Sequence, residues 1–239
     1  MKNKMIFIVF MDTNKCQPVE LNKYGICGGK VVSKTLFFDM GYTLVDEGAV
    51  WKRRCEEQAA TEEAKCLGLS AETIYQEIEK ASLARLPQYR TVVKKFQLKT
   101  VAPYRHELEK LYDDVPNVLH LLSDKYELGV IANQTDGLRE RLDRFGILKY
   151  FTHVISSWDV QVMKPDTRIY EYALETAKCL SHEAVMIGDR IDNDIAPAKS
   201  VGMRTVWIKQ GFGRLQTPLC EEDVPDYTIE HLSELLNIF

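Results

Sequence analysis

The sequence predicts an α/β fold in which helices cover both faces of a parallel β-sheet, with an all-helical segment inserted after the first core strand. From Thr35 onward, short unbroken apolar runs alternate with helical patterns, as is typical of buried parallel strands and their connecting helices. Between Asp46 and about Asp114 the strand patterns stop, and apolar residues recur at helical spacing in a charged background. The chain's 239 residues suffice for one large domain with such an insertion.

Four apolar runs predict the core strands: Thr35–Phe38, Leu128–Ala132, Ala184–Ile187 and Arg204–Ile208. Three of them end at polar positions, namely Asp39, Asn133 and Gly188-Asp189. The carboxyl ends of parallel strands lie at one edge of a sheet, where α/β proteins bind their ligands. We therefore expect these polar residues to converge on one crevice.

Three helices are predicted between and after these strands. Leu138, Leu142 and Phe145 lie at i, i+4 and i+7 behind a Thr135-Asp136 start, and Gly146 supplies the stop. A second helix follows Pro165, and a third runs from Ile195 to Gly202. Their apolar positions are typical of helices that pack on a sheet.

The helical insertion is predicted to span residues 47–114, which leaves 35–46 and 115–239 as the core. One helix begins around Trp51, a second contains Ile74, Ile78 and Leu83, and a third contains Leu108, Leu111 and Tyr112. At roughly 65 residues, the insertion is far longer than an ordinary strand-to-helix loop.

Residues 1–34 are predicted to form an N-terminal extension. Gly25, Gly28 and Gly29 suggest a turn between two short strands, such as a hairpin at a sheet edge. The apolar run Met5–Met11 spans seven residues, whereas a membrane-spanning helix needs about 20. Lys2 and Lys4 precede that run, but no small-residue cleavage site follows it, so we expect a short strand rather than a signal peptide.

Net charge and cysteine spacing indicate which classes of binding partner to expect. The 31 basic and 35 acidic residues give a net charge of −4, and no basic stripe that would bind nucleic acid is evident. The six cysteines form no Cys-x-x-Cys pair, which favours reduced thiols in a cytoplasmic protein. We expect a small-molecule ligand and no membrane or nucleic-acid partner.

Asp39 is the candidate nucleophile. A carboxylate at the end of a buried strand can attack phosphorus and form an aspartyl phosphate, and Gly41 permits a tight turn beside it. The simpler interpretation of a lone aspartate here is a turn or a helix cap. The later segments of the chain favour a catalytic role for Asp39.

Those later segments supply complementary charges. Asp189 and Asp194 lie in an acidic loop after a strand, and carboxylate oxygens of this kind suit Mg²⁺. Lys164 precedes a helix start and could join the nucleophile to a phosphoryl oxygen. Asn133 and Gln134 lie where a strand meets a helix N-terminus, a position that favours anions. Taken singly, each has a plain structural alternative: a solvated turn, a surface lysine or a capping segment.

In this order, the segments resemble the haloacid dehalogenase-like (HAD) hydrolase superfamily over about Thr35 to Phe239. The segment Asp39-Met40-Gly41-Tyr42-Thr43 is similar to its nucleophile motif, Ala132-Asn133 to its Ser/Thr motif, Lys164 to its lysine, and Gly188-Asp189 with Asp194 to its acidic loop. The resemblance implies a Rossmann-like sheet with a helical cap of the first class.

For the site, the resemblance implies Asp39 and Lys164 as catalytic residues, and Thr43, Asn133, Gln134 and Lys164 as phosphate-binding residues. It also implies a Mg²⁺ ion held by Asp39, the Gly41 carbonyl, Asp189 and Asp194. Two positions depart from the family pattern. Gly41 stands where phosphatases of this family have the aspartate that acts as acid and base, and Ala132 replaces the usual phosphate-binding Ser or Thr.

The expected function is therefore Mg²⁺-dependent hydrolysis of a small phosphorylated metabolite, slow because the second aspartate is missing. Two alternatives stay open: a dehalogenase- or phosphonatase-like hydrolase, whose relatives lack that aspartate, and a non-catalytic member that binds a phosphorylated ligand. Trp51, Arg53, Arg54, Tyr89 and Arg90 are the candidates for contacts with the substrate from the helical insertion.

Overall fold

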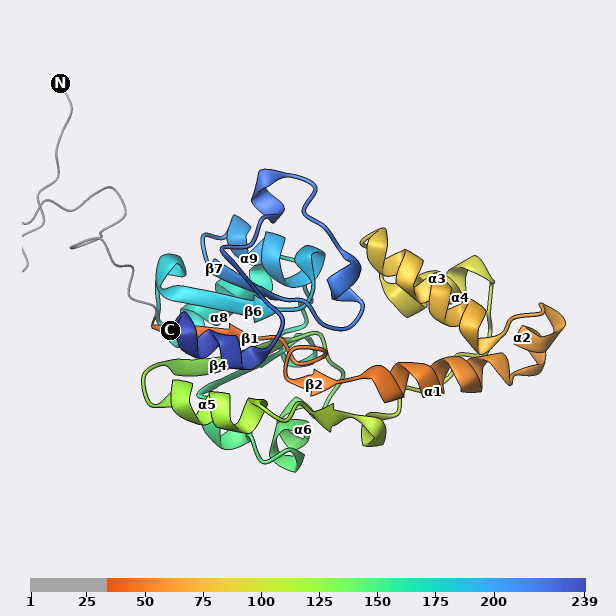
Figure 1. The fold of residues 1–239 in the computed structure, drawn as a ribbon, viewed down its shortest axis with the longest axis horizontal. Helices are drawn as coiled ribbons and strands as arrows, with labels where there is room; N and C mark the ends of the chain where they lie inside the picture. Colours follow the sequence, from red (N-terminus) through yellow and green to blue (C-terminus); the bar gives the residue numbers. More distant parts are fainter. Residues whose placement is uncertain (1–33) are drawn as a thin grey trace, which may run out of the picture. The chain divides into compact units, whose positions relative to one another are not determined.

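A six-stranded parallel sheet forms the centre of the computed structural model, which describes residues 34–239 (Figure 1). The strand order is β5-β4-β1-β6-β7-β8. The strands are β1 (Thr35–Phe38), β4 (Glu127–Ala132), β5 (His153–Ser156), β6 (Ala184–Gly188), β7 (Arg204–Ile208) and β8 (Tyr227–Ile229). This arrangement confirms the Rossmann-like α/β fold class. The hairpin expected in the N-terminal extension falls outside the described residues.

The helices connect these strands and lie on both faces of the sheet. They are α5 (Val115–Ser123), α6 (Leu138–Arg144), α7 (Ser157–Val160), α8 (Arg168–Ala177), a π-helical turn η4 (Ile191–Ile195) and α9 (Ala196–Ser200). The 3-10 turns are η2 (Leu148–Tyr150), η3 (Ser181–Glu183), η5 (Gly213–Leu215), η6 (Glu221–Asp223) and η7 (Leu232–Asn237). In the described part of the chain, no helix is long and apolar enough to cross a membrane.

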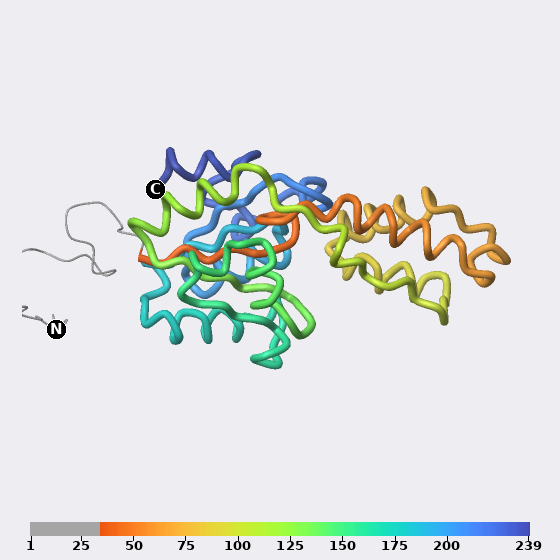
Figure 2. The backbone as a smooth tube through the Cα atoms, turned by 90° about the horizontal axis from the view of Figure 1, so that it is seen from below, coloured from red at the N-terminus to blue at the C-terminus, as the bar shows by residue number. Residues whose placement is uncertain are grey.

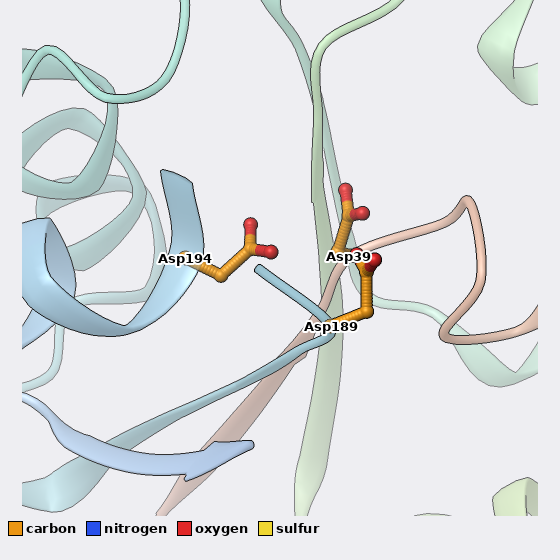
Figure 3. Close-up of side chains that lie close together, drawn as sticks. All are labelled: Asp39, Asp189 and Asp194. Atoms are coloured by element: carbon orange, nitrogen blue, oxygen red, sulfur yellow. The ribbon is translucent and has the colours of Figure 1, made fainter. Parts of the chain in front are cut away.

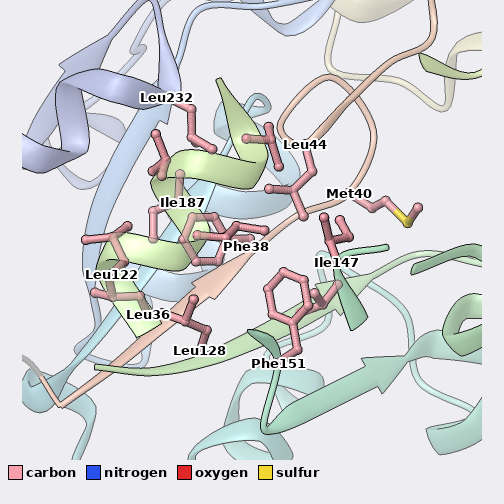
Figure 4. Close-up of a cluster of buried hydrophobic side chains, with 14 of the residues drawn as sticks. Leu36, Phe38, Met40, Leu44, Leu122, Leu128, Ile147, Phe151, Ile187 and Leu232 are labelled. Atoms are coloured by element: carbon pink, nitrogen blue, oxygen red, sulfur yellow. The ribbon is translucent and has the colours of Figure 1, made fainter. Parts of the chain in front are cut away.

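Alternating side chains of β1 divide the core into two layers. Leu36 and Phe38 pack with apolar residues of α5 and α6 on one face, as Figure 4 shows for part of this cluster. Phe37 points to the other face, where it joins residues of α8 and α9. Because β1 lies in the middle of the sheet and is covered on both sides, every one of its side chains is apolar or buried.

Four helices leave the core after β1 and make up the helical insertion: α1 (Gly48–Ala59), α2 (Glu62–Cys66), α3 (Ala71–Leu83) and α4 (Gln88–Lys95). They have an apolar cluster of their own. The chain departs through β2 (Val45–Asp46) and returns through a 3-10 turn, η1 (His106–Leu108), and β3 (Lys110–Leu111). The two strands pair antiparallel, and Figure 2 shows the outgoing and returning segments together.

One prediction for the insertion was wrong, and one helix was missed. The helix expected around Leu108, Leu111 and Tyr112 is instead the turn η1 and the strand β3, because Leu111 pairs with Val45 across the neck of the insertion. The helix α4 was not expected, since its short sequence has few apolar positions. In the core, α6 begins at Leu138 after Gly137, so residues 133–137 form a loop rather than the first turn of a helix.

Candidate active site

The ends of β1 and β6 place two aspartates side by side. These strands are neighbours in register, with Phe38 opposite Ile187, and the amide of Asp39 donates to the carbonyl of Ile187 at 2.8 Å. Asp189 follows Gly188, the last residue of β6. The parallel register therefore brings together two carboxylates that are 150 residues apart in the chain.

The π-helical turn η4 adds a third carboxylate. The backbone amide of Arg190 donates to Oδ2 of Asp194 at 3.0 Å, which folds the acidic loop back on itself. Gly188 is required here, because a Cβ at this position would lie 2.4 Å from the Cβ of Asp194. Asp39, Asp189 and Asp194 each offer one oxygen within 4.8 Å of the others (Figure 3). Such a cluster of hard oxygen donors fits a divalent cation.

Lys164 is the cation beside this cluster. Its ammonium donates to Oδ1 of Asp39 at 2.6 Å and to Oδ1 of Asp194 at 2.5 Å, and its side chain is almost fully buried. Lys164 and Asp39, which the sequence analysis expected to act together, are thus in direct contact. The ammonium contacts two of the three carboxyl groups and does not contact Asp189, so the cluster has an excess of negative charge when all three are ionised.

Burial and this excess of negative charge shift the pKa values of the buried groups. Burial raises the pKa of Asp189 well above its usual range, and the charges of Asp194 and Asp39 add to the shift. Burial also raises the pKa of Asp194, to about 6, although Lys164 opposes the shift. Burial disfavours the charge on Lys164, but the two carboxylates keep its pKa above that of an ordinary lysine. A bound cation would relieve this repulsion.

Asn133 contacts the lysine segment through both ends of its side-chain amide. Its Nδ2 donates to the carbonyl of Lys164 and its Oδ1 accepts from the amide of Lys164, both at 2.8 Å. Asn133 therefore fixes the backbone that carries the lysine. The two other residues expected to bind phosphate lie differently: Gln134 lines the cavity and contacts Arg141, whereas Thr43 is fully buried and its hydroxyl has no hydrogen-bond partner.

A cavity of about 580 Å³ opens above the carboxylates and is lined by both the core and the helical insertion. Of the five insertion residues expected to meet a ligand, Trp51, Tyr89 and Arg90 line this cavity. The two others are used elsewhere. Arg53 pairs with Glu57, and the guanidinium of Arg54 stacks on the ring of Tyr89 at 3.6 Å.

Glu47 is the main residue of the site that sequence reasoning missed. It lies between β2 and α1, lines the cavity with Asp39, and is 9% exposed. The indole Nε1 of Trp51 donates to its Oε2 at 3.0 Å. Burial raises the pKa of Glu47 to about 7, while polar contacts from Tyr104 and Trp51 limit the rise. No spacing rule relates position 47 to Asp39, since an irregular turn separates them.

Known proteins share this architecture and part of this sequence. A glyceraldehyde 3-phosphate phosphatase of Methanopyrus kandleri is 37% identical over 134 residues, which are 54% of this chain and 56% of that protein. The chain thus spans about half the length of this curated relative. The crystal structure of a HAD phosphatase from Thermococcus onnurineus superposes with a TM-score of 0.61 at 28% identity, covering 86% of this chain and 97% of that one.

A 2-haloacid dehalogenase from Pseudomonas syringae pv. Tomato DC3000 has the same fold. Its TM-score is 0.57 at 24% identity, and the match covers 87% of this chain and 98% of that one. The fold therefore occurs with different reactions. Residues 36–208 match the family model for haloacid dehalogenase-like hydrolases, and the chain, with its strand-end aspartates, lysine and helical insertion, belongs to that family.

Proposed function

We propose that this protein is a Mg²⁺-dependent phosphatase of small phosphorylated metabolites. One observation carries the proposal: the carboxylate of Asp39 lies at a cavity, bonded to a buried lysine and within 4.8 Å of two further carboxylates. A nucleophile, a fixed cation and a set of oxygen ligands are what phosphoryl transfer to a carboxylate requires. The similarity to a named phosphatase supports the same reaction class.

In the proposed reaction, an oxygen of Asp39 attacks phosphorus and the bond between phosphorus and the ester oxygen breaks. The alcohol leaves with a proton, and an aspartyl phosphate remains on Asp39. Water then attacks that phosphorus, the bond to Asp39 breaks, and inorganic phosphate leaves. Lys164 holds Asp39 in place and offsets the charge that gathers as carboxylate and phosphoryl group approach.

Asp39, Asp189 and Asp194 are the residues that would hold Mg²⁺, with the backbone carbonyl of Gly41 as a further ligand. Three carboxylates facing one lysine form a donor set with unbalanced negative charge, which fits a divalent cation. Held by these residues, Mg²⁺ would supply positive charge that offsets the negative charge of the carboxylate and the phosphoryl group. The carboxylate cluster is also what favours a phosphatase over a dehalogenase, since displacement of a halide needs no such cluster.

The test measures inorganic phosphate released from a panel of phosphate monoesters, with Mg²⁺ and with EDTA. We expect the parent protein to be active only with the metal. Asp39→Asn should reduce release to background while leaving the melting temperature close to that of the parent, because the amide has the same shape but is a poor nucleophile. Asp159→Asn, on the exposed face of α7, is the matched control and should keep full activity.

Three results would contradict the proposal. Hydrolysis that persists in Asp39→Asn would remove this residue from the mechanism. Metal-independent halide release from a 2-haloacid would identify a dehalogenase. Absence of release across the panel, combined with stabilisation of the fold by a phosphorylated compound, would identify a binding protein.

A further inference from the structure

The space beside Gly41 is occupied by another residue's carboxyl group. A Cβ built on Gly41 would lie 2.5 Å from Oε1 of Glu47 and 2.8 Å from its Cδ. Gly41 is not among the described residues with positive φ, so its backbone conformation does not call for glycine. A side chain at residue 41 would fit only if the Glu47 carboxyl group moved aside, because that group fills the volume the side chain would take.

Glu47 reaches this place from the start of the helical insertion. It directly precedes α1, and its carboxyl group is held by the indole of Trp51, one turn further along the chain. The rings of Trp51 and Tyr104 meet edge to face at 6.2 Å, and those of Trp51 and Phe212 at 5.4 Å. Glu47 is 9% exposed, and it lines the cavity together with Asp39.

Glu47 differs in its ion pairs from a buried carboxylate that has a structural role. Glu109, which is similarly buried, pairs with both Arg141 and Arg144. Among residues 34–239, no lysine, arginine or histidine forms an ion pair with Glu47. A buried carboxylate ordinarily forms an ion pair with a cation. A buried carboxyl group that lacks such an ion pair and faces the cavity is available to exchange a proton with a ligand.

We propose that Glu47 is a catalytic residue, the acid and base of the reaction, acting from the position that a side chain at residue 41 would occupy. This inference rests on the proposed phosphatase function. As Asp39 attacks phosphorus, the Glu47 carboxyl group gives its proton to the departing ester oxygen and becomes a carboxylate. It then takes a proton from the water that attacks the aspartyl phosphate, which restores the carboxyl group and frees Asp39 and phosphate.

The first experiment compares two substrates in Glu47→Gln. Glycerol phosphate has a poor leaving group that needs the proton, whereas p-nitrophenyl phosphate has a good one that does not. We expect turnover of glycerol phosphate to fall by about 10²–10⁴-fold, the usual contribution of a general acid or base. With p-nitrophenyl phosphate we expect a burst of nitrophenolate equal to the enzyme concentration, followed by slow turnover, because the second step lacks its base. The intact mass should then include one phosphoryl group.

The second experiment places a carboxyl group at residue 41 in place of that of Glu47. Glu47→Ala removes the acid and clears the space, and adding Gly41→Asp in the same chain should recover turnover of glycerol phosphate. Gly41→Asp alone should lower the melting temperature, because two carboxyl groups compete for one volume. Glu57→Gln, on the helix α1 that follows Glu47 but paired with Arg53 and Arg105, is the control and should match the parent.

The results separate this inference from the proposed function. If the parent hydrolyses both substrates and a folded Glu47→Gln does so at the parent rate, Glu47 is not the acid and base. Equal loss on both substrates without a burst would likewise overturn the role. If Glu47→Gln fails to fold, the pair Glu47→Ala and Gly41→Asp/Glu47→Ala decides, because absence of recovery in a folded double variant contradicts the assignment. A parent that releases no phosphate refutes the proposed function itself.

Discussion

Asn133 shows how one side chain can set the position of a charged group that it does not touch. Its amide bonds to both the backbone N–H and the carbonyl of Lys164, so it closes the loop that carries the lysine. The family resemblance implied that Asn133 binds phosphate. The geometry assigns both ends of its amide to the protein backbone instead.

Asn133→Ala should therefore weaken both stability and activity. Two backbone groups lose their partners, which costs about 1–3 kcal/mol for each group left unsatisfied. Turnover should fall because Lys164 is no longer held against Asp39. Chemical denaturation and steady-state kinetics with p-nitrophenyl phosphate test this, with Asn117→Ala, an exposed position of α5, as the control. Unchanged stability would show that the two hydrogen bonds contribute nothing.

At the scale of elements, a short segment after β7 supplies several of the contacts between the helical insertion and the core. Ser82 of α3 donates to the carbonyl of Phe212 at 3.0 Å, and Gln216 Nε2 donates to the carbonyl of Ser82 at 3.1 Å. The ring of Phe212 also packs against Tyr42 from the core and Tyr75 from the insertion. This segment therefore joins the two parts across the cavity.

Phe212→Ala should loosen this junction. Removal of a buried phenylalanine costs about 3–5 kcal/mol where the surroundings do not collapse into the space. We expect faster amide hydrogen exchange in α3, with β1 still protected, because the core layers do not contain this ring. Leu219→Ala, an exposed site in the same region, is the control. Equal loss of protection in α3 and β1 would instead mean that the two parts unfold together.

At the scale of the whole molecule, the site places a cluster of carboxylates in the interior of a chain with a net charge of −4. Burial raises the pKa of Glu47 to about 7 and of Asp194 to about 6, and it raises that of Asp189 as well. The folded protein then binds more protons than the unfolded chain between the ordinary carboxyl pKa and these values. Its stability falls as pH rises through this window.

We predict that the melting temperature in EDTA falls between about pH 4.5 and pH 7, and that Mg²⁺ counteracts the fall by binding the ionised carboxylates. Asp189→Asn should raise the metal-free melting temperature at pH 7.5, by about 2–4 °C for each kcal/mol of repulsion removed, and should abolish the response to Mg²⁺. Differential scanning calorimetry measures both effects, with the exposed Asp143→Asn as reference. A Mg²⁺ response retained in Asp189→Asn would place the ion elsewhere.

Local sequence patterns determined much of the fold and of the carboxylate cluster. The four apolar runs all became strands, since an unbroken apolar run fits a strand that is covered on both faces. Asp39 and Asp189 were predictable because parallel strands align their carboxyl ends. The strands β5 and β8 were not predicted, because they lie at the sheet edges and carry polar residues such as His153 and Thr228.

Only the tertiary structure decided what surrounds that cluster. Pairing of Leu111 with Val45 turned an expected helix into a strand, and the fold used Asn133 to hold Lys164. The tertiary structure also decided the position of Glu47, whose carboxyl group fills the space that Gly41 leaves open. Strands and their terminal residues follow from short-range periodicity, whereas these contacts join segments whose mutual position depends on irregular turns and on the packing of the whole chain.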